Sequence, residues 1–290
     1  MKLKAWIEAM RLRTLPVSVA GVLAATAYAL ADGTFNAIAA TTCLIFAVLC
    51  QIASNFANEY FDYKAGRDKA GREGPRRGVT EGDISPVHMF RATYLVLCLA
   101  ALAGLTLTYW GGTWLIFVGI AIALGVFAYS AGPYPLSTHC MGEVGVIVFF
   151  GLVPVNFTYY VQALHWSSDV FLGSLAIGLM GANVLIINNY RDRADDVAVN
   201  KHTLATALPG WAMPVLYMAN ALIAVTLTVP VWYSGCVAWF LVPALYLVAA
   251  SAVTVRMTRL TGRHLTPLLG ITSVLMFLYS ALMVVCACFH

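Results

Sequence analysis

The sequence has few charged residues. Asp, Glu, Lys and Arg make up 10% of its 290 residues, whereas 61% are hydrophobic. Soluble domains carry about 25% charged and about 45–50% apolar residues. The mean hydropathy of +0.80 agrees with this imbalance. A soluble domain of ordinary size is therefore excluded, and a net charge of +4 is too small to indicate a nucleic-acid partner. We expect an all-α, polytopic integral membrane protein.

The sequence also lacks the usual patterns of cysteine and histidine sites. None of its seven cysteines forms a CxxC pair, and its six histidines have no metal-ligand spacing. We expect the cysteines to be small core residues of apolar helices. The first apolar run lacks a small-residue cleavage pattern, so we expect an uncleaved first helix, preceded by a short interfacial helix within residues 1–13.

Long stretches without acidic or basic residues indicate the membrane spans, because a helix needs about 20 apolar residues to cross a bilayer. Seven stretches are long enough: 14–31, 33–58, 92–142, 144–168, 170–190, 202–255 and 264–290. Two of them have double length and are expected to break at Gly111-Gly112 and between Pro230 and Gly235. The sequence therefore predicts nine helices in a single membrane domain over residues 1–290.

The basic residues support this count. With nine helices, all 17 Lys and Arg residues fall before the first helix or in loops on the same side of the membrane. Basic residues gather on the cytoplasmic side, so we expect a cytoplasmic N-terminus and an external C-terminus in a bacterial inner (cell) membrane. Eleven of the 13 acidic residues share that side, and only Asp32 and Asp169 lie opposite. Charge-based orientation does not need acidic residues, so their accumulation points to a site.

A short polar pattern occurs twice. Residues 58–62 and 188–192 both read N-x-Y-x-D, at the ends of the second and sixth predicted helices. Four helices separate them, so both helices run in the same direction and end on the same side, as in a parallel duplication. Amides buried in apolar helix ends are costly without a partner.

Each repeat predicts a column of oxygen ligands. Residues four apart share one helix face. The columns comprise Asn58 and Asp62, with Asn55 one turn below and Asp68 after a turn at Gly66, and Asn188, Asp192 and Asp196. Mg²⁺ binds through one or two carboxylates together with substrate phosphates. Basic, glycine-containing loops follow both columns, which suits a diphosphate.

Together these features resemble the UbiA superfamily of intramembrane aromatic prenyltransferases over the whole chain. The carboxylate at Asp68 in place of one at Gly66, the Gly-Pro-Arg-Arg-Gly run at 74–78 and the Gly-Pro-Tyr-Pro-Leu segment at 132–136 are similar to the branch that acts on 1,4-dihydroxy-2-naphthoate. The resemblance implies a ring of nine helices capped by cytoplasmic active-site loops at about 59–90 and 190–207.

The resemblance also implies the reaction. A polyprenyl diphosphate would ionise with the help of Mg²⁺, and 1,4-dihydroxy-2-naphthoate would take the prenyl group and lose carbon dioxide, giving a demethylmenaquinone. It implies catalytic and metal-binding roles for Asp62, Asp68, Asp192 and Asp196, with Asn58 and Asn188 as further metal ligands. Diphosphate contacts are expected from Arg72, Arg77 and Lys201, and substrate contacts from Asn55, Tyr134 and Glu143.

Other functions remain open at this point. A secondary transporter would also be polytopic and internally repeated, although transporters place ionisable residues near the bilayer midplane. A CDP-alcohol phosphatidyltransferase would need a D-x-x-D-G-x-x-A-R run, which the sequence lacks. Within the superfamily, 4-hydroxybenzoate or homogentisate could replace the naphthoate as acceptor.

Overall fold

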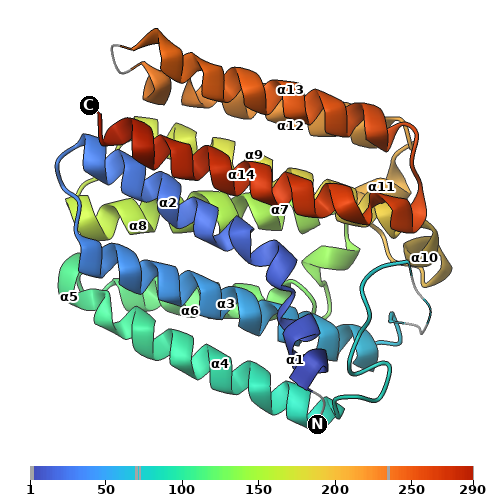
Figure 1. Cartoon of the computed structure of the whole chain (residues 1–290). Coiled ribbons are helices and arrows are strands. Elements are labelled where there is room, and N and C mark those ends of the chain that lie inside the picture. The colour runs from blue at the N-terminus through green and yellow to red at the C-terminus, as the bar shows by residue number, and fades with distance from the viewer. Residues whose placement is uncertain (1–2, 69–70, 72, 234–235, 290) are drawn as a thin grey trace.

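The chain folds into a bundle of long helices, shown by a computed structural model that describes residues 3–68, 71, 73–233 and 236–289. Most helices run roughly along one direction (Figure 1). The α-helices are α1 Leu3–Met10, α2 Leu15–Ala31, α3 Ala37–Lys64, α4 Pro86–Thr106, α5 Thr108–Gly111, α6 Leu115–Ala128, α7 Gly142–Val146, α8 Val153–Ala163, α9 Ser168–Arg191, α10 Arg193–Ala198, α11 Leu204–Ala207, α12 Ala212–Thr228, α13 Leu241–Met257 and α14 Thr266–Ala287. Between α7 and α8, a π-helical segment, η3, covers Ile147–Leu152.

Eight of the nine predicted membrane spans are present at full length. Among the described residues, eight helical segments are long and apolar enough to cross a membrane. The remaining predicted span, in the second half of the stretch 92–142, is α6, an apolar helix of 14 residues. The prediction of an all-helical, polytopic membrane protein is confirmed. Its physical reason is that lipid offers no hydrogen bonds to the backbone, whereas a helix satisfies its own backbone groups.

Helix breakers divide the two double-length stretches as predicted. After α5, Gly112 adopts a φ of +88° and redirects the chain into α6. A side chain would be strained in this conformation, which glycine adopts readily. Pro230 lies in a 3-10 turn, η4 Val229–Trp232, after α12. The expected interfacial helix is also present as α1.

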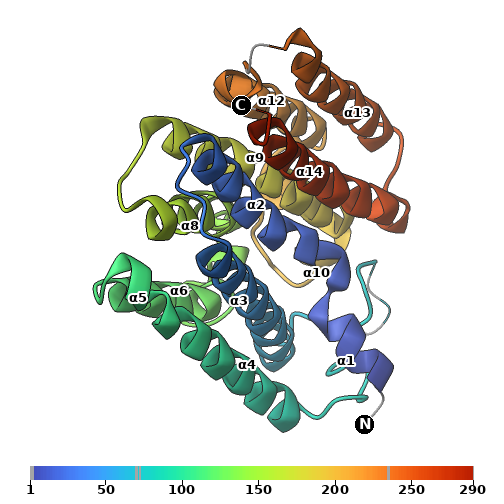
Figure 2. The ribbon, with the colours of Figure 1, turned by 60° about the vertical axis from the view of Figure 1, so that its left-hand side comes forward.

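Small residues let the central helices pack closely. Helix α2 contributes five buried alanines, and it packs between α14, α9 and α8 (Figure 2). A Cβ atom on Gly151 of η3 would lie 2.4 Å from the Cα of Gly178 on α9, so these backbones touch. Close backbone approach replaces the hydrophobic effect as the source of helix association in lipid.

The cysteines differ from the prediction. Only Cys43 and Cys286 are buried, whereas Cys98, Cys236 and Cys288 are exposed. A thiol is apolar enough to face lipid, so an apolar helix does not force it into the core. The seven cysteines all lie among the described residues, and none of them forms a disulfide.

Candidate active site

The first N-x-Y-x-D motif lies on the last turns of α3, with Asn58 at its centre. The side chain of Asn58 is buried and makes three contacts with distant segments. Its Oδ1 accepts hydrogen bonds from Arg11 and, at 3.3 Å, from Nη2 of Arg77. Its Nδ2 donates to Oγ of Ser130, 2.8 Å away, just after α6. Asn58 therefore joins α3 to the N-terminal segment, the loop after α3 and the end of α6.

The carboxylates of the first motif are paired with arginines. Asp62 is buried and lies 3.2 Å from Nη1 of Arg67, which also donates to the backbone oxygen of Ser130. Beyond α3 the chain turns at Gly66, with a φ of +68°, as predicted. Asp68 then lies 3.3 Å from Nε of Arg77. Two of the predicted metal ligands, Asp62 and Asp68, are thus ion-paired with guanidinium groups.

Two further residues of this helix hold neighbouring segments. Glu59 is buried, and its Oε1 accepts a hydrogen bond of 3.0 Å from the backbone N–H of Val79. Asn55 donates from Nδ2 to the backbone oxygen of Met10, 2.9 Å away. These bonds attach the loop after α3 and the end of α1 to the helix end.

The second motif continues across a break in the helix. Helix α9 ends at Arg191, and α10 begins two residues later, with Asp192 between them. The backbone N–H of Asp192 still bonds to the oxygen of Asn188 at 3.1 Å, and that of Asp196 to the oxygen of Asp192 at 2.8 Å. Because this is the four-residue spacing of an α-helix, the predicted column is retained.

Local cations neutralise the second motif. Nε of Arg191 lies 2.6 Å from Asp192, and its Nη2 donates to Oδ1 of Asn188 at 2.9 Å. Lys201 lies 3.1 Å from Asp196. It follows Asn200, whose left-handed backbone (φ +54°) turns the chain back towards α10, since asparagine tolerates that conformation.

Both motifs lie at the same end of the bundle, where α10 and α11 are seen in Figure 1. The backbone N–H of Glu73, in the loop after α3, donates to Oδ2 of Asp195 at 2.7 Å. Burial raises the pKa of the Tyr129 hydroxyl, and the charges of Glu143, Asp62 and Asp196 raise it further, whereas Arg11 lowers it. One phenol is therefore within electrostatic reach of carboxylates from both motifs.

The two predicted substrate contacts near the loop before α7 lie in different surroundings. Glu143 is buried, and its Oε1 accepts from Nδ2 of Asn189 in the second motif, 2.9 Å away. Tyr134 is 62% exposed and stacks on His139 with the ring centroids 3.7 Å apart. The structure brings Glu143 to the site and leaves Tyr134 on the surface of the loop.

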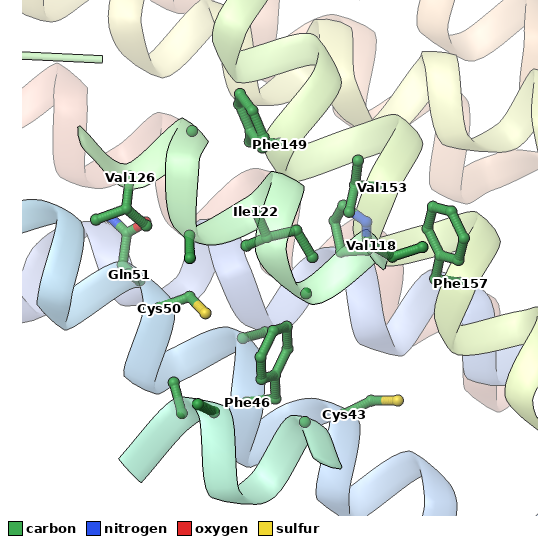
Figure 3. A pocket seen from close by; sticks show the side chains of 18 of the residues that line it. Cys43, Phe46, Cys50, Gln51, Val118, Ile122, Val126, Phe149, Val153 and Phe157 are labelled. Carbon is green, nitrogen blue, oxygen red and sulfur yellow. The ribbon is translucent and has the colours of Figure 1, made fainter. Parts of the chain in front are cut away.

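A largely apolar cavity of about 390 Å³ adjoins this end of the bundle (Figure 3). Its walls come from α3, α4, α6 and the segment from α7 to α8, with Phe46, Ile122, Phe149 and Phe157 among the lining side chains. Tyr129 also lines it, so the cavity begins beside the charged motifs. Leu105, Ile116 and Ile120 line it too and are about half exposed, which opens one wall towards lipid.

The donor chemistry suits a hard divalent cation. In the part of the chain that the structure describes, no three His, Cys, Asp or Glu side chains converge to hold a metal ion. The carboxylates instead face arginine and lysine. All candidate ligands nevertheless offer carboxylate or amide oxygens, which Mg²⁺ prefers, and each motif supplies several of them at one helix end.

Sequence reasoning missed three residues of this cluster and named one outside the structure. Arg11, Arg67 and Ser130 contact motif side chains, whereas the sequence analysis counted Arg11 only as cytoplasmic charge and Arg67 only as part of a basic loop. Position 11, close to the first helix and among other basic residues, offered no separate signal. Arg72, a predicted diphosphate contact, lies outside the described residues.

The sequence and fold match known proteins over most of the chain. Residues 18–280 match the model of the UbiA prenyltransferase family. A 1,4-dihydroxy-2-naphthoate octaprenyltransferase of Mycobacterium tuberculosis is 35% identical over 95% of this chain and 94% of its own length. An enzyme of the same name from Haemophilus influenzae is 36% identical over 71% of this chain and 70% of its own length.

Solved structures share the fold at low sequence identity. A UbiA homolog from Archaeoglobus fulgidus bound to DMAPP and Mg²⁺ has a TM-score of 0.63 and 18% identity, covering 94% of this chain and 98% of that one. An apo UbiA homolog from Aeropyrum pernix K1 reaches a TM-score of 0.68 at 15% identity, covering 99% of this chain and 98% of that one. The chain belongs to the UbiA prenyltransferase family.

Proposed function

We infer that this membrane protein is an aromatic prenyltransferase that moves a polyprenyl group from its diphosphate to 1,4-dihydroxy-2-naphthoate. The observation that carries the inference is the juxtaposition of two acidic helix ends with an apolar cavity. One substrate has a charged head and a long hydrocarbon tail, and this site offers a matching surface for each part. Relatives that carry the naphthoate prenyltransferase name cover nearly the whole chain.

The reaction makes one carbon–carbon bond. The bond between the first prenyl carbon and the diphosphate oxygen breaks, and diphosphate leaves with the electron pair. The ring carbon that carries the carboxylate attacks the allylic carbon. Carbon dioxide then leaves, its bonding electrons return to the ring, and the product is the quinol (1,4-diol) form of a demethylmenaquinone. Water would capture the allylic cation, so the capping loops must exclude it.

The motif residues suit a role in holding Mg²⁺ and diphosphate. Asn58, Asp62 and Asp68 would hold one ion, and Asp192 and Asp196, supported by Asn188, a second. Bound Mg²⁺ supplies positive charge that stabilises the leaving diphosphate. Arg77 and Lys201 already lie beside these carboxylates, at 3.3 Å from Asp68 and 3.1 Å from Asp196.

The ion pairs suggest how the site changes when it is loaded. Buried carboxylates need positive partners, and without another cation the chain supplies them from arginine and lysine. A divalent cation would compete for the same oxygens. The released side chains of Arg77 and Lys201 would then turn to the diphosphate oxygens, whose geometry suits guanidinium and ammonium donors. Arg72 would join them from the same loop.

The cavity suits the prenyl tail. Its lining is largely apolar, and it starts beside Tyr129 at the charged end. A volume of about 390 Å³ is at the low end for drug-sized ligands, so a long polyprenyl chain exceeds it. The half-exposed wall at Leu105, Ile116 and Ile120 gives the remaining isoprene units a route into lipid.

Glu143, which is bonded to the second motif, and Asn55, one turn below the first, remain our candidates for acceptor contacts, together with Tyr134 in the loop before α7. The loops at about 59–90 and 190–207 would cap one membrane domain over residues 1–290. We place these loops and the N-terminus in the cytoplasm, and the C-terminus outside the cell membrane, from the distribution of basic residues.

The test is a substrate panel. The purified protein in detergent or lipid is given MgCl₂, allylic diphosphates of several lengths, and 1,4-dihydroxy-2-naphthoate, 4-hydroxybenzoate or homogentisate in separate reactions. We expect the prenylated naphthalenediol, or the quinone that oxygen forms from it during work-up, together with carbon dioxide, from the first acceptor alone, identified by mass spectrometry. Product from another acceptor would show that the protein is a prenyltransferase of the same family with a different acceptor. Ion uptake into proteoliposomes without any prenylated product would instead support a transporter.

A further inference from the structure

Two polar side chains in the cavity wall have oxygen atoms without a hydrogen-bond partner among the described residues. They are Oε1 of Gln51 and Oγ of Ser18, on α3 and α2. Gln51 is 8% exposed and Ser18 is 4% exposed, and both line the cavity. Figure 3 shows Gln51 on the cavity wall near Val126. Buried polar atoms in proteins are nearly always paired, so two unpaired oxygens on side chains that line the same cavity point to a ligand.

The position of Gln51 narrows the choice of ligand. Gln51 precedes Asn58 by seven residues, which is two helical turns or about 10 Å along the axis of α3. It therefore lies two turns from the charged motif, towards the middle of α3, and it lines the same cavity as Tyr129. A group bound at Gln51 belongs to a molecule that reaches from the charged end into the apolar space.

Only one substrate of the proposed reaction can satisfy these atoms. The prenyl tail is hydrocarbon and offers no hydrogen bond, while the diphosphate is drawn to the cations of the two motifs. The aromatic acceptor has a carboxylate and two hydroxyl groups. Its carboxylate favours the charged end, and the hydroxyl at ring position 4 lies farther from that carboxylate than the hydroxyl at position 1.

We propose that Gln51, together with Ser18, binds the hydroxyl group of the acceptor that lies farther from its carboxylate. The hydroxyl donates to Oε1 of Gln51, and the Ser18 hydroxyl bonds to the same oxygen of the acceptor. Gln51 thus makes the site specific for a 1,4-diol, because the motif carboxylates do not contact the second hydroxyl group. The assignment rests on the proposed function and adds the feature by which the site recognises its acceptor.

The variant Gln51→Met tests this assignment, since methionine has a similar length and no hydrogen bond. The expected result is a KM for 1,4-dihydroxy-2-naphthoate raised about tenfold, the effect of losing one buried hydrogen bond. The inhibition constant of 1-hydroxy-2-naphthoate, which lacks the second hydroxyl, should stay within about twofold of its wild-type value. The KM for the allylic diphosphate should also stay unchanged.

The melting temperature of the ligand-free protein separates recognition from structure. Since Oε1 of Gln51 has no protein partner to lose, Gln51→Met should not lower it. The matched control is Gln162→Met on α8, because Gln162 accepts from the backbone N–H of Asn36 at 3.1 Å and donates to the oxygen of Thr158 at 2.8 Å. That change should lower the melting temperature and leave both acceptor constants unchanged.

Three results would overturn the assignment. One is an unchanged KM for the diol in Gln51→Met. Another is an equal rise in the diol KM and in the inhibition constant of the mono-hydroxy acid, which would mean a general distortion of the cavity. The third is a lower melting temperature with unchanged acceptor constants, as expected if an ordered water pairs with Gln51. Failure of the wild-type protein to prenylate the diol would refute the proposed function itself, before any variant is made.

Discussion

The two halves of the charged site share a sequence pattern but are held together differently. In the second motif the ion pairs of the two aspartates are local, because Arg191 pairs with the adjacent Asp192 and Lys201 with Asp196, five positions earlier. In the first motif Asn58 is contacted from 47, 19 and 72 residues away, by Arg11, Arg77 and Ser130. The aspartates of the second motif are therefore paired within their own helix end, although Asn189 also donates to Glu143 of α7, whereas Asn58 of the first motif is held by three other segments.

Loss of a carboxylate from either half should have the largest effect. Asp62→Asn and Asp192→Asn each remove a charge that the leaving diphosphate and its cations need, and we expect prenyl transfer to fall about 1000-fold in both. The measurement is initial rate at saturating substrates. Asp169→Asn, an exposed carboxylate at the opposite end of the bundle, is the control and should keep full activity. Near-normal turnover by one of the two motif variants would mean that the halves are not equivalent in chemistry.

Removal of the basic partners should affect the two halves differently, because their contacts differ in number and in range. Arg77→Met breaks contacts to Asp68 and Asn58, so we expect about a 30-fold loss of kcat/KM, whereas Lys201→Met loses one contact and about tenfold. Limited proteolysis should cut the loop after α3 faster in Arg77→Met than in wild type. The same loop should stay protected in Lys201→Met. Equal protection in both variants would contradict the view that the first half depends on long-range contacts.

The smallest effect is expected at the direct bond between the halves. Asp195→Ala removes the acceptor for the backbone N–H of Glu73 and leaves the neighbouring Asp196 in place. A single hydrogen bond at a partly exposed site contributes little, so we expect the KM for the allylic diphosphate to rise about threefold at constant kcat. A large fall in kcat would show that Asp195 takes part in catalysis.

The difference between local and long-range contacts also explains which features could be predicted from the sequence. Spans, breaks and the helix-end columns follow from local rules: length of apolar runs, glycine and proline, and four-residue spacing. Thus Gly112 and Gly66 turn the chain where expected, and the column from Asn188 persists across the break at Asp192. Arg11 and Ser130 contact Asn58 only because distant segments fold together, and sequence periodicity does not predict such a contact.

The resemblance to a family and the geometry contributed different parts of the site. The family pattern named the carboxylates, and the structure placed them at one end and gave each its cation. Neither periodicity nor the pattern singled out Gln51, whose significance lies in an oxygen that finds no partner once α2 and α3 are packed around the cavity. Burial without a partner can be recognised only in three dimensions.

The shortness of α6 has a consequence for the surrounding lipid. Fourteen residues of helix extend about 21 Å, against about 30 Å for the hydrocarbon layer of a typical bilayer. We expect this hydrophobic mismatch to thin the bilayer on that side of the protein, next to the half-open wall of the cavity. Acyl-chain length in reconstituted membranes should therefore tune how readily long isoprenoids enter and leave the enzyme.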